Sequence, residues 1–406
     1  MRGNWRSLLW VGIRALPALA PLAAVAAQPA AARVVRYPAG ARAPVTWRVT
    51  GPPVLSIGGA GASGPGELAK VIAVVRLTDG RVVVANRASN ELRYFAADGR
   101  HLVTAGRKGQ GPAEFDGMAE VHRSGDSIAV VDRSGRLQVF GPTGTLLRAY
   151  PRPTYDDRAV FGWAGLMPDG SGIVRGLETP TDTLADHITA WMSFGLRSPS
   201  ADGARLMVRY PYLETERMNG AVSAGQRGHT PLWLGPALRT ARAGARFCAG
   251  YGDTWTVRCV DGAGREVVRT VRDLPAAPVG PGDRGAFEET FRKNFRTMPP
   301  AQLDLTLKMF LYARVRGQLG RFVGTAQGDL WVATFAVADE VPRGDGEWPF
   351  PTGESRWTVL GSDGTWRADA ILPARFALMD AGPGWVAGVL RDEDDVERVV
   401  VYRLVP

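Results

Sequence analysis

The sequence predicts an all-β fold, a six-bladed β-propeller of four-stranded antiparallel blades, and three observations lead to this prediction. A phrase consisting of a strand that ends in Gly, a short polar loop, Gly-Pro, an acidic residue and a large apolar residue occurs at 57–68 and again at 105–115. Four strand-like runs lie between the copies: Ile72–Leu77, Arg81–Asn86, Glu91–Phe95 and His101–Thr104. The resulting unit of roughly 45 to 50 residues has the period of a propeller blade.

Composition is compatible with one large β domain. The chain has 406 residues, of which 45% are hydrophobic and 22% charged, so it can bury a large core and is far from the composition of disordered chains. Closed all-β repeats often reach this size as a single domain. We therefore expect one propeller over 45–406.

The N-terminal residues have the features of a secretory signal peptide, predicted over 1–27. Three arginines precede an apolar run at Ala15–Ala24, and small residues at 25–27 offer a cleavage site before Gln28. A membrane anchor is the weaker alternative, because Pro17 and Pro21 interrupt the run. No Cys lies near the cleavage site, so the sequence does not support a lipoprotein anchor.

The segment 28–44 is rich in Pro, Ala and Arg and is predicted to be a flexible tether. After signal cleavage we expect no membrane span and a periplasmic or extracellular location.

Glycine-containing turns mark the blades. Tight turns between third and fourth strands are expected at Asp98-Gly99, Thr143-Gly144, Asp202-Gly203, Ala263-Gly264 and Asp363-Gly364. Together with the turns between first and second strands, they predict blades at about 70–106, 117–150, 158–208, 230–271, 319–371 and 376–404.

The last predicted blade is one strand short. Val45–Thr50 and Val54–Ile57 form a strand-like stretch that runs into the first copy of the repeated phrase, and elsewhere that phrase follows a fourth strand. We expect this N-terminal strand to complete the last blade and close the ring, which removes two exposed sheet edges.

One segment, about 282–314, has a helical pattern. Phe287, Phe291 and Phe295 recur at every fourth position, and Pro299-Pro300 opens a second apolar segment. We predict a helical insert packed on the rim of the propeller through its Phe side chains; a mobile lid over a pocket is the alternative.

Two cysteines, Cys248 and Cys259, are predicted to form a disulfide. A tight turn centred on Asp253-Thr254 would place them opposite each other across a hairpin, and exported proteins favour such pairing.

The stretches 77–85 and 106–115 resemble those of exported bacterial six-bladed β-propeller proteins related to the NHL-repeat class. The residues concerned read Leu-x-Asp-Gly-Arg-Val-Val-Val-Ala and Gly-Arg-Lys-Gly-Gln-Gly-Pro-Ala-Glu-Phe. The resemblance is clearest over 45–150 and fainter over 319–404. It implies fold and export, because these motifs specify turns and crossings and include no catalytic residue.

A ligand site is expected where the long connections lie. In a propeller, the loops between second and third strands share one face with the crossings between blades, and all the long insertions here belong to that set: 177–187, 209–229, 275–318 and 336–355. Polar residues delivered to this face, at the mouth of the central channel, are the candidate ligand-binding residues: Asn86, Arg87, Asn90, Arg107, Lys108, Asp132 and Arg133. Loop hydrogen bonding is the alternative role of each.

Motifs for catalysis or metal binding are lacking in the sequence. None of the four histidines forms a metal-ligand pair, and no nucleophile elbow or phosphate-binding loop occurs. The acidic run 392–395 lacks the spacing of a calcium loop and is expected to be a solvated turn. We therefore name no catalytic residue, metal ligand or cofactor.

The net charge of +9 does not predict a nucleic-acid partner, because the arginines are dispersed and three belong to the signal segment. The function that the sequence favours is a monomeric, non-catalytic, exported scaffold that recognises a protein, peptide, glycan or envelope component. The alternative is a calcium-assisted hydrolase or lyase with its ion at the channel mouth, so that enzymatic activity stays an open question.

Overall fold

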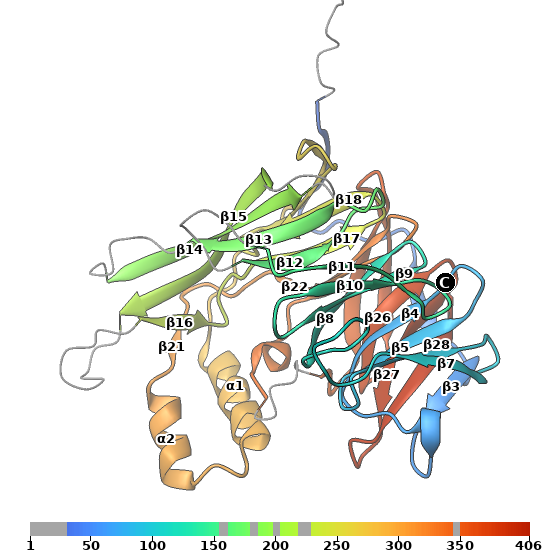
Figure 1. Ribbon diagram of the computed structural model, residues 1–406. Coiled ribbons are helices and arrows are strands. Elements are labelled where there is room, and N and C mark those ends of the chain that lie inside the picture. The colour runs from blue at the N-terminus through green and yellow to red at the C-terminus, as the bar shows by residue number, and fades with distance from the viewer. Residues whose placement is uncertain (1–30, 154–160, 179–185, 198–203, 218–228, 344–349) are drawn as a thin grey trace, which may run out of the picture. The chain divides into compact units, whose positions relative to one another are not determined.

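The computed structural model describes residues 31–153, 161–178, 186–197, 204–217, 229–343 and 350–406. The chain divides into two units, 1–31 and 32–406, and the second is mostly β, with twisted and curled sheets (Figure 1). The predicted signal peptide, the first residues of the predicted tether and the Asp202-Gly203 turn lie outside the described residues.

Two sheets have four antiparallel strands in chain order. The first consists of β4 (Val71–Arg76), β5 (Val82–Asn86), β6 (Glu91–Phe95) and β7 (His101–Ala105). The second consists of β8 (Met118–Ser124), β9 (Ser127–Asp132), β10 (Leu137–Phe140) and β11 (Leu146–Tyr150). Both occupy the stretches expected at 70–106 and 117–150.

The third sheet is larger than expected. It consists of β12 (Phe161–Leu166), β13 (Gly172–Glu178), β14 (His187–Arg197), β15 (Arg205–Arg217), β16 (His229–Trp233) and β21 (Leu311–Tyr312). The predicted start of the fourth blade, at 230, was wrong, because β16 at 229–233 pairs with β15 of the third sheet. Strand β15 continues to Arg217, beyond the expected end at 208, and its extra length gives β16 a partner.

The fourth sheet contains a strand that the sequence analysis missed. Its members are β17 (Arg239–Ala243), β18 (Arg246–Gly250), β19 (Trp255–Val260), β20 (Glu266–Arg272) and β1 (Arg33–Tyr37), which pairs with β20 in parallel. The prediction of a flexible tether was therefore wrong over 33–37. Tyr37 fixes this strand: its hydroxyl accepts a hydrogen bond from the Trp366 backbone N–H at 2.7 Å, and the two rings meet edge to face at 5.5 Å.

The remaining strands form one nine-stranded network. They are β22 (Leu319–Gly324), β23 (Leu330–Thr334), β24 (Ser355–Leu360), β25 (Trp366–Leu372), β26 (Phe376–Gly382), β27 (Trp385–Arg391), β28 (Glu397–Val405), β2 (Thr46–Val49) and β3 (Leu55–Gly58). As expected for 54–57, β3 adds antiparallel to β28, so that β26, β27, β28 and β3 make four strands. Strand β2 instead lies parallel to β25 and touches the end of β28, which links the two groups.

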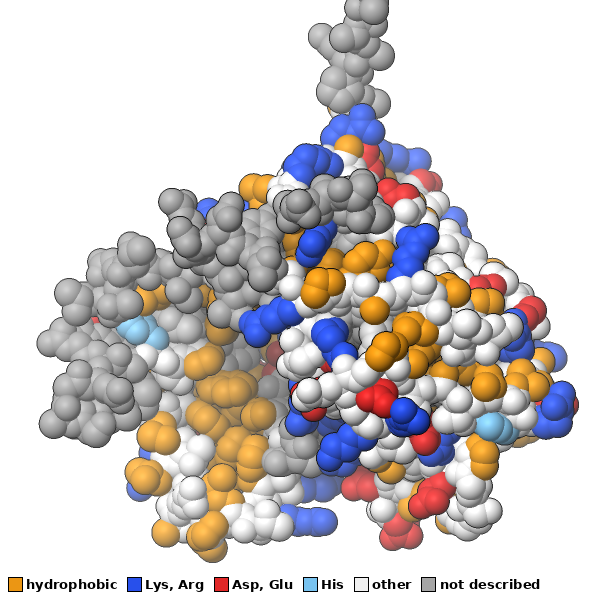
Figure 2. Space-filling view, in the orientation of Figure 1, with side chains coloured by type: hydrophobic (Ala, Val, Ile, Leu, Met, Phe, Trp, Pro, Cys, Tyr) orange, Lys and Arg blue, Asp and Glu red, His pale blue; other side chains and the backbone are white. Residues whose placement is uncertain are grey.

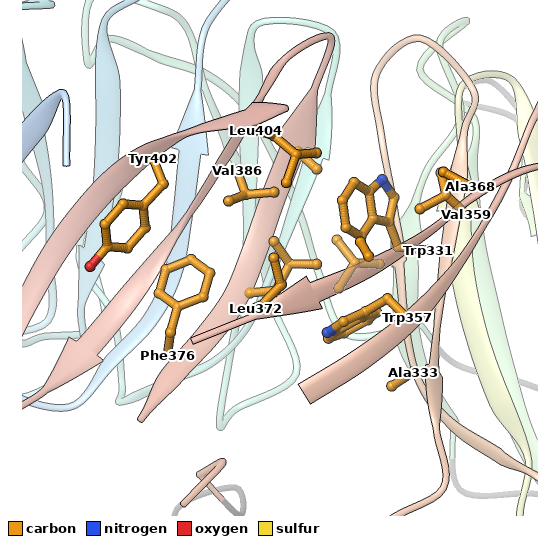
Figure 3. Packing of buried hydrophobic residues seen from close by; sticks show 14 of the residues in the cluster. Trp331, Ala333, Trp357, Val359, Ala368, Leu372, Phe376, Val386, Tyr402 and Leu404 are labelled. Carbon is orange, nitrogen blue, oxygen red and sulfur yellow. The ribbon is translucent and has the colours of Figure 1, made fainter. Parts of the chain in front are cut away.

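Hydrophobic clusters lie between consecutive sheets. Figure 3 shows one of them, which contains Trp331 and Trp357 of the β22–β25 group and Phe376 and Tyr402 of the next group, with Leu372 between the two pairs. Trp331 and Trp357 are edge to face at 6.3 Å, and all four side chains are buried. Large aromatic side chains thus fill the space between neighbouring sheets.

The first strands of these groups also lie side by side. Strand β17 neighbours β22, β22 neighbours β26, β26 neighbours β4, β4 neighbours β8, and β8 neighbours β12. Side chains on these strands can therefore meet across sheets.

The turn at Asp363-Gly364 shows why glycine marks the tight turns. Gly364 has φ +81°, and a Cβ there would come within 2.5 Å of Val268 Cγ1 on β20. The turn of one group therefore packs against the neighbouring sheet, and only glycine combines this approach with this backbone conformation.

The predicted helical insert is present. Helix α1 (Pro281–Asn294) and helix α2 (Pro300–Lys308) form a hairpin beside β16 and β21 (Figure 1). Phe287 and Phe291 are buried, and Phe287 contacts Trp233 with 5.2 Å between ring centroids. The insert therefore has a small core of its own, built with β16 and with Val341. None of the described helices is both long and apolar enough to span a membrane.

The predicted disulfide is present in the fourth sheet. Cys248 on β18 lies opposite Cys259 on β19, and their sulfur atoms are bonded. The connection between the two strands includes Asp253-Thr254, as expected.

Candidate functional site

The seven predicted ligand-binding residues lie at strand ends and in connections of the first two sheets. Among the described residues, no hydrogen bond or ion pair joins two side chains of this set.

Asn86 is the last residue of β5, and Arg87 and Asn90 belong to the connection between β5 and β6. The buried Asn86 accepts a hydrogen bond from the Ala69 N–H at 2.8 Å and donates one to Ser89 at 2.7 Å. Asn90 accepts one from the Met118 N–H at 3.0 Å, and Arg87 is held through its backbone. The two asparagines stabilise loops, as buried polar groups usually do.

Arg107, Lys108, Asp132 and Arg133 differ in exposure. Asp132 is buried and accepts hydrogen bonds from Ser134 and Arg136, whereas Arg107, Lys108 and Arg133 are exposed. Arg107 is paired with Glu114 at 2.6 Å. The side chains of Lys108 and Arg133 are exposed and make no hydrogen bond or ion pair to the described residues.

A different group of charged residues gathers where the long connections lie. We call Arg239, Arg321, Asp339 and Glu340 the Arg321 cluster. Arg239 begins β17, Arg321 lies early in β22, and the two acids belong to the 3-10 helix η2 (Val337–Glu340) in the connection between β23 and β24. Because Leu319 at the start of β22 pairs with Thr334 at the end of β23, these residues meet at the same end of the sheet.

A β-bulge positions Arg321. The register of β22 against β23 shifts between Leu319 and Phe322, and a Cβ at Gly320 would come within 2.9 Å of the Thr334 carbonyl oxygen. Glycine thus permits the bulge, and Arg321 within it is exposed between two buried neighbours.

Arg321 is the exposed member of the Arg321 cluster. The residue is exposed, but burial lowers the pKa of its guanidinium, an effect that Asp339 partly opposes. Within the described part of the chain, no hydrogen bond or ion pair holds the guanidinium.

The charge of the Arg321 cluster also depends on its other three members, Arg239, Asp339 and Glu340. Arg239 donates a hydrogen bond to Glu340, and both side chains are largely buried. Burial raises the pKa of Asp339 to about 6, helped by the charge of Glu340 and opposed by Arg321 and Arg239. The cluster therefore holds one satisfied ion pair, one arginine without a partner and one acid that titrates near neutrality.

A second cluster lies at the opposite ends of the first strands, and we call it the Asp380 cluster. Asp380 on β26 accepts hydrogen bonds from Arg123 of β8 at 3.0 Å and from the Arg76 N–H of β4 at 2.9 Å. Arg242 of β17 donates to the Arg123 carbonyl oxygen. Burial raises the pKa of Asp380 to about 6, and burial with the charge of Arg123 lowers that of Arg242 to about 10. Every charge here has a protein partner, which indicates a structural role.

A third group joins the second and third sheets. Arg175 of β13 donates to Glu120 of β8, and His122 Nε2 lies 3.4 Å from Glu120 Oε2. Burial alone would raise the pKa of Glu120, but His122 and Arg175 outweigh it and bring the pKa to about 2. Glu120 is thus a stable carboxylate compensated by its neighbours.

Among the described residues, no three His, Cys, Asp or Glu side chains are grouped so as to hold a metal ion. In the acidic run, Asp392 accepts hydrogen bonds from the backbone of Asp394 and Val396, and Asp395 lies 3.4 Å from Arg375. The run is therefore a hairpin turn, as predicted.

The face drawn in Figure 2 mixes positive and negative side chains over its surface. No continuous basic stripe covers that face, in keeping with the dispersed arginines of the sequence.

Comparison with known proteins gives no family. No family model matches the chain, and no curated protein matches it. Among solved structures, a member of the duf4221 family from Bacteroides vulgatus is 9% identical, with a TM-score of 0.49, over 86% of this chain and 96% of that one.

Two further structures are similar at this level. A protein of Bacteroides fragilis predicted to be exported is 12% identical with a TM-score of 0.46, over 92% of this chain and 100% of that one. Regucalcin, a calcium-binding protein from Agrobacterium tumefaciens, is 10% identical with a TM-score of 0.33, over 88% of this chain and 96% of that one. With TM-scores below 0.5, these similarities carry no argument about function.

Proposed function

We propose that this chain is an exported six-bladed β-propeller, similar to the NHL-repeat class, that acts as a non-catalytic binding scaffold. Its ligand, a component of the cell envelope, binds at the end of the sheets where the long connections lie. The observation that carries the proposal is the Arg321 cluster, which brings charged side chains from three separate elements to that end.

Six blades are supported by the order of the hydrophobic clusters. If β22–β25 and β26–β28 with β3 count as two blades, the clusters connect the first blade to the second, the second to the third, and so on to the sixth. A further cluster connects the sixth blade back to the first, through residues such as Val399 and Val74. A closed circuit of this kind is what a propeller requires. Strands β1, β2, β16 and β21 are additions to its outer edges.

Export is supported by the disulfide, because such bonds persist in oxidising compartments. It is also supported by the signal-like composition of residues 1–27. We propose a periplasmic or extracellular location.

A binding role fits the chemistry of the Arg321 cluster better than catalysis does. Glu340 and Asp380 each accept a hydrogen bond from an arginine, so their charge is already compensated. A calcium-assisted hydrolase would need carboxylates that converge on an ion without such partners. That alternative therefore has the weaker support.

The test is a binding screen with the chain starting at Gln28, using thermal unfolding and a panel of envelope glycans, peptides and divalent ions. A ligand at about a hundred times its Kd should stabilise the fold by about 2.7 kcal/mol. The variant Arg239→Ala should weaken binding, whereas Arg100→Gln, at the exposed tight turn of the first sheet, should leave it unchanged. Loss of stability with chelator and recovery with calcium would favour the metal-dependent alternative, and an effect of Arg100→Gln alone would refute the location.

A further inference from the structure

We infer that the outer edge of the second sheet binds an extended, acidic peptide segment of a protein partner, which pairs with β11 as a further strand. This surface is separate from the Arg321 cluster. The inference therefore goes beyond the proposed function and does not depend on it.

Added strands recur in this fold. Strand β1 adds to β20, β16 adds to β15, and β2 adds to β25, so that the last strand of three groups is covered by a further strand. In the described part of the chain, β11 pairs with β10 alone, and its other edge presents unpaired backbone N–H and C=O groups. An open edge of this kind can bind an extended peptide through main-chain hydrogen bonds.

Exposure distinguishes β11 from the other last strands that carry no added strand. Leu147, Arg148 and Ala149 are exposed one after another, whereas exposed and more buried residues alternate along β7 and β3. The 3-10 helix η1 (Gly64–Gly66) also lies beside β7. Leu147 is 53% exposed, so β11 offers an apolar side chain together with its backbone groups.

A cavity lies beside the same edge, between β11 and the turn that joins β12 to β13. It has a volume of about 550 Å³, and the described residues that line it are Arg148, Ala149, Tyr150 and Asp169. This volume is within the range of ligand pockets, so the cavity has room for a side chain of the added segment. Because side chains alternate between the two faces of a strand, every second residue of the segment would enter the cavity and the others would pass Leu147.

Two arginines give this edge a positive charge. Arg148 and Arg152 are exposed, and neither side chain makes a hydrogen bond or ion pair to the described residues. The Arg148 guanidinium lies against the turn, since a Cβ at Gly170 would come within 2.9 Å of its Nη1. The Asp169 carboxylate accepts a hydrogen bond from the Ser171 N–H at 2.9 Å. Acidic residues in the added segment complement the two arginines, whereas β11 of a second copy would bring two more arginines to the same place.

The probe is a labelled seven-residue peptide with blocked ends in which valine and glutamate alternate. Its binding to the chain from Gln28 is measured by fluorescence polarisation. We expect saturable binding, and at least tenfold weaker binding of the same peptide with lysine in place of glutamate. Equal or tighter binding of the lysine peptide would overturn the inference.

N-methylated peptides test the pairing of the backbones. One peptide is methylated on the nitrogens of its valines, and the other on those of its glutamates. An added strand directs only every second N–H toward its neighbour, so one of the two should bind as the parent peptide does and the other at least tenfold more weakly. Equal affinities of the two methylated peptides would exclude strand addition and overturn the inference.

Variants locate the site. Arg148→Glu should weaken binding of the glutamate peptide at least tenfold and strengthen that of the lysine peptide, because it reverses the charge beside the cavity. Arg100→Glu, the same reversal at an exposed arginine before β7, should change neither affinity. Since the Arg148 side chain makes no hydrogen bond or ion pair, Arg148→Glu should keep the melting temperature of the parent protein. Unchanged binding of the glutamate peptide to Arg148→Glu would refute the location on β11.

Two further measurements separate this inference from its neighbours. Sedimentation of the parent protein should show a monomer at the concentrations of the titration. A dimer that the glutamate peptide dissociates would assign the edge to a second copy of the chain and overturn the inference. Arg239→Ala, which should weaken binding of the envelope ligand, should leave the affinity for the peptide unchanged, so that each proposal can fail without the other.

Discussion

At the scale of single residues, the most telling contact is a buried ion pair between the last strand and its neighbours. Arg391 and Glu397 lie 2.6 Å apart and are 8% and 5% exposed at their side chains. Glu397 also accepts a hydrogen bond from the Val71 N–H of β4 at 2.8 Å. One carboxylate thus joins β27, β28 and the first sheet.

Glu397→Gln should therefore be strongly destabilising. It weakens the charge-assisted hydrogen bonds that this buried carboxylate accepts from Arg391 and from the Val71 N–H, which should cost about 1.5–3 kcal/mol. Denaturant unfolding measures the loss, and Glu393→Gln, an exposed change in the adjacent turn, should stay within about 0.5 kcal/mol of the parent. Equal stability of the two variants would contradict the assigned role.

Asp380 should give the protein a pH-dependent stability. Its pKa is about 6 in the folded state and about 3.9 when unfolded, so the folded state binds the proton more tightly. The contribution is present below pH of about 4 and is lost as the pH rises to about 6, an effect on the order of 2–3 kcal/mol.

The measurement is the free energy of unfolding of the parent protein and of Asp380→Asn between pH 4 and 7. The difference between the two free energies of unfolding should change over this pH range. Taking the difference also removes the contribution of Asp339, which titrates in both proteins. Parallel curves would show that burial does not raise the pKa of Asp380.

The sequence predicted where candidate residues lie in the fold better than it predicted what their side chains do. Asn86 and Asp132 were expected near the looped end because each follows a second strand, but their side chains are buried in loop hydrogen bonds. Arg321 was missed, although an arginine between Gly320 and Phe322 in an apolar strand is a recognisable signal of a bulge. Its partners Asp339 and Glu340 come from another connection, and only the fold brings them together.

At the scale of elements, the disulfide and the helical hairpin are local units whose stabilities can be tested. The disulfide closes a short hairpin, and the chain-entropy model gives such a loop about 2–4 kcal/mol. Replacing both Cys248 and Cys259 by Ala should lower the free energy of unfolding by that amount. Mass analysis without reductant should find no free thiol in the parent protein; two free thiols would contradict the bond.

The helical hairpin should depend on its aromatic core. Phe291 stacks on Phe295 at 4.2 Å and meets Phe310 at 4.9 Å, so Phe291→Ala should cost about 3–5 kcal/mol in the insert. Hydrogen exchange of the α1 amides reports this directly. Leu305→Ala, on the exposed side of α2, is the control and should leave exchange unchanged.

Element boundaries followed from turn chemistry. The glycine turns placed most strands within a few residues, because a tight turn needs a positive φ that glycine supplies. Strand β1 was missed and β16 was assigned to the wrong unit, since each adds outside an expected set of four strands, to β20 and to β15. Periodicity alone does not identify such a partner.

At the scale of the whole molecule, the N-terminal strands lie along three successive groups of strands. Strand β1 adds to β20, β2 to β25 and to the end of β28, and β3 to β28. The segment 33–58 therefore contacts three of the six proposed blades.

Truncation should reveal this graded dependence. A chain that starts at Ala32 should melt as the parent does, one that starts at Val45 should melt several degrees lower through loss of β1 and the Tyr37 contact, and one that starts at Gly59 should not fold. Circular dichroism on purified chains measures all three. Equal melting of the chains from Ala32 and from Gly59 would refute closure by β3.

The same arrangement has a kinetic consequence. Strands β2 and β3 are synthesised early, but β28, with which both pair, is synthesised far later, so the ladder between them cannot form while the chain is still emerging. Such non-local pairing slows folding, and until it occurs the edges of β3 and β28 stay open to other strands. The nascent chain is thus kept extended for longer, as the export that we propose would require.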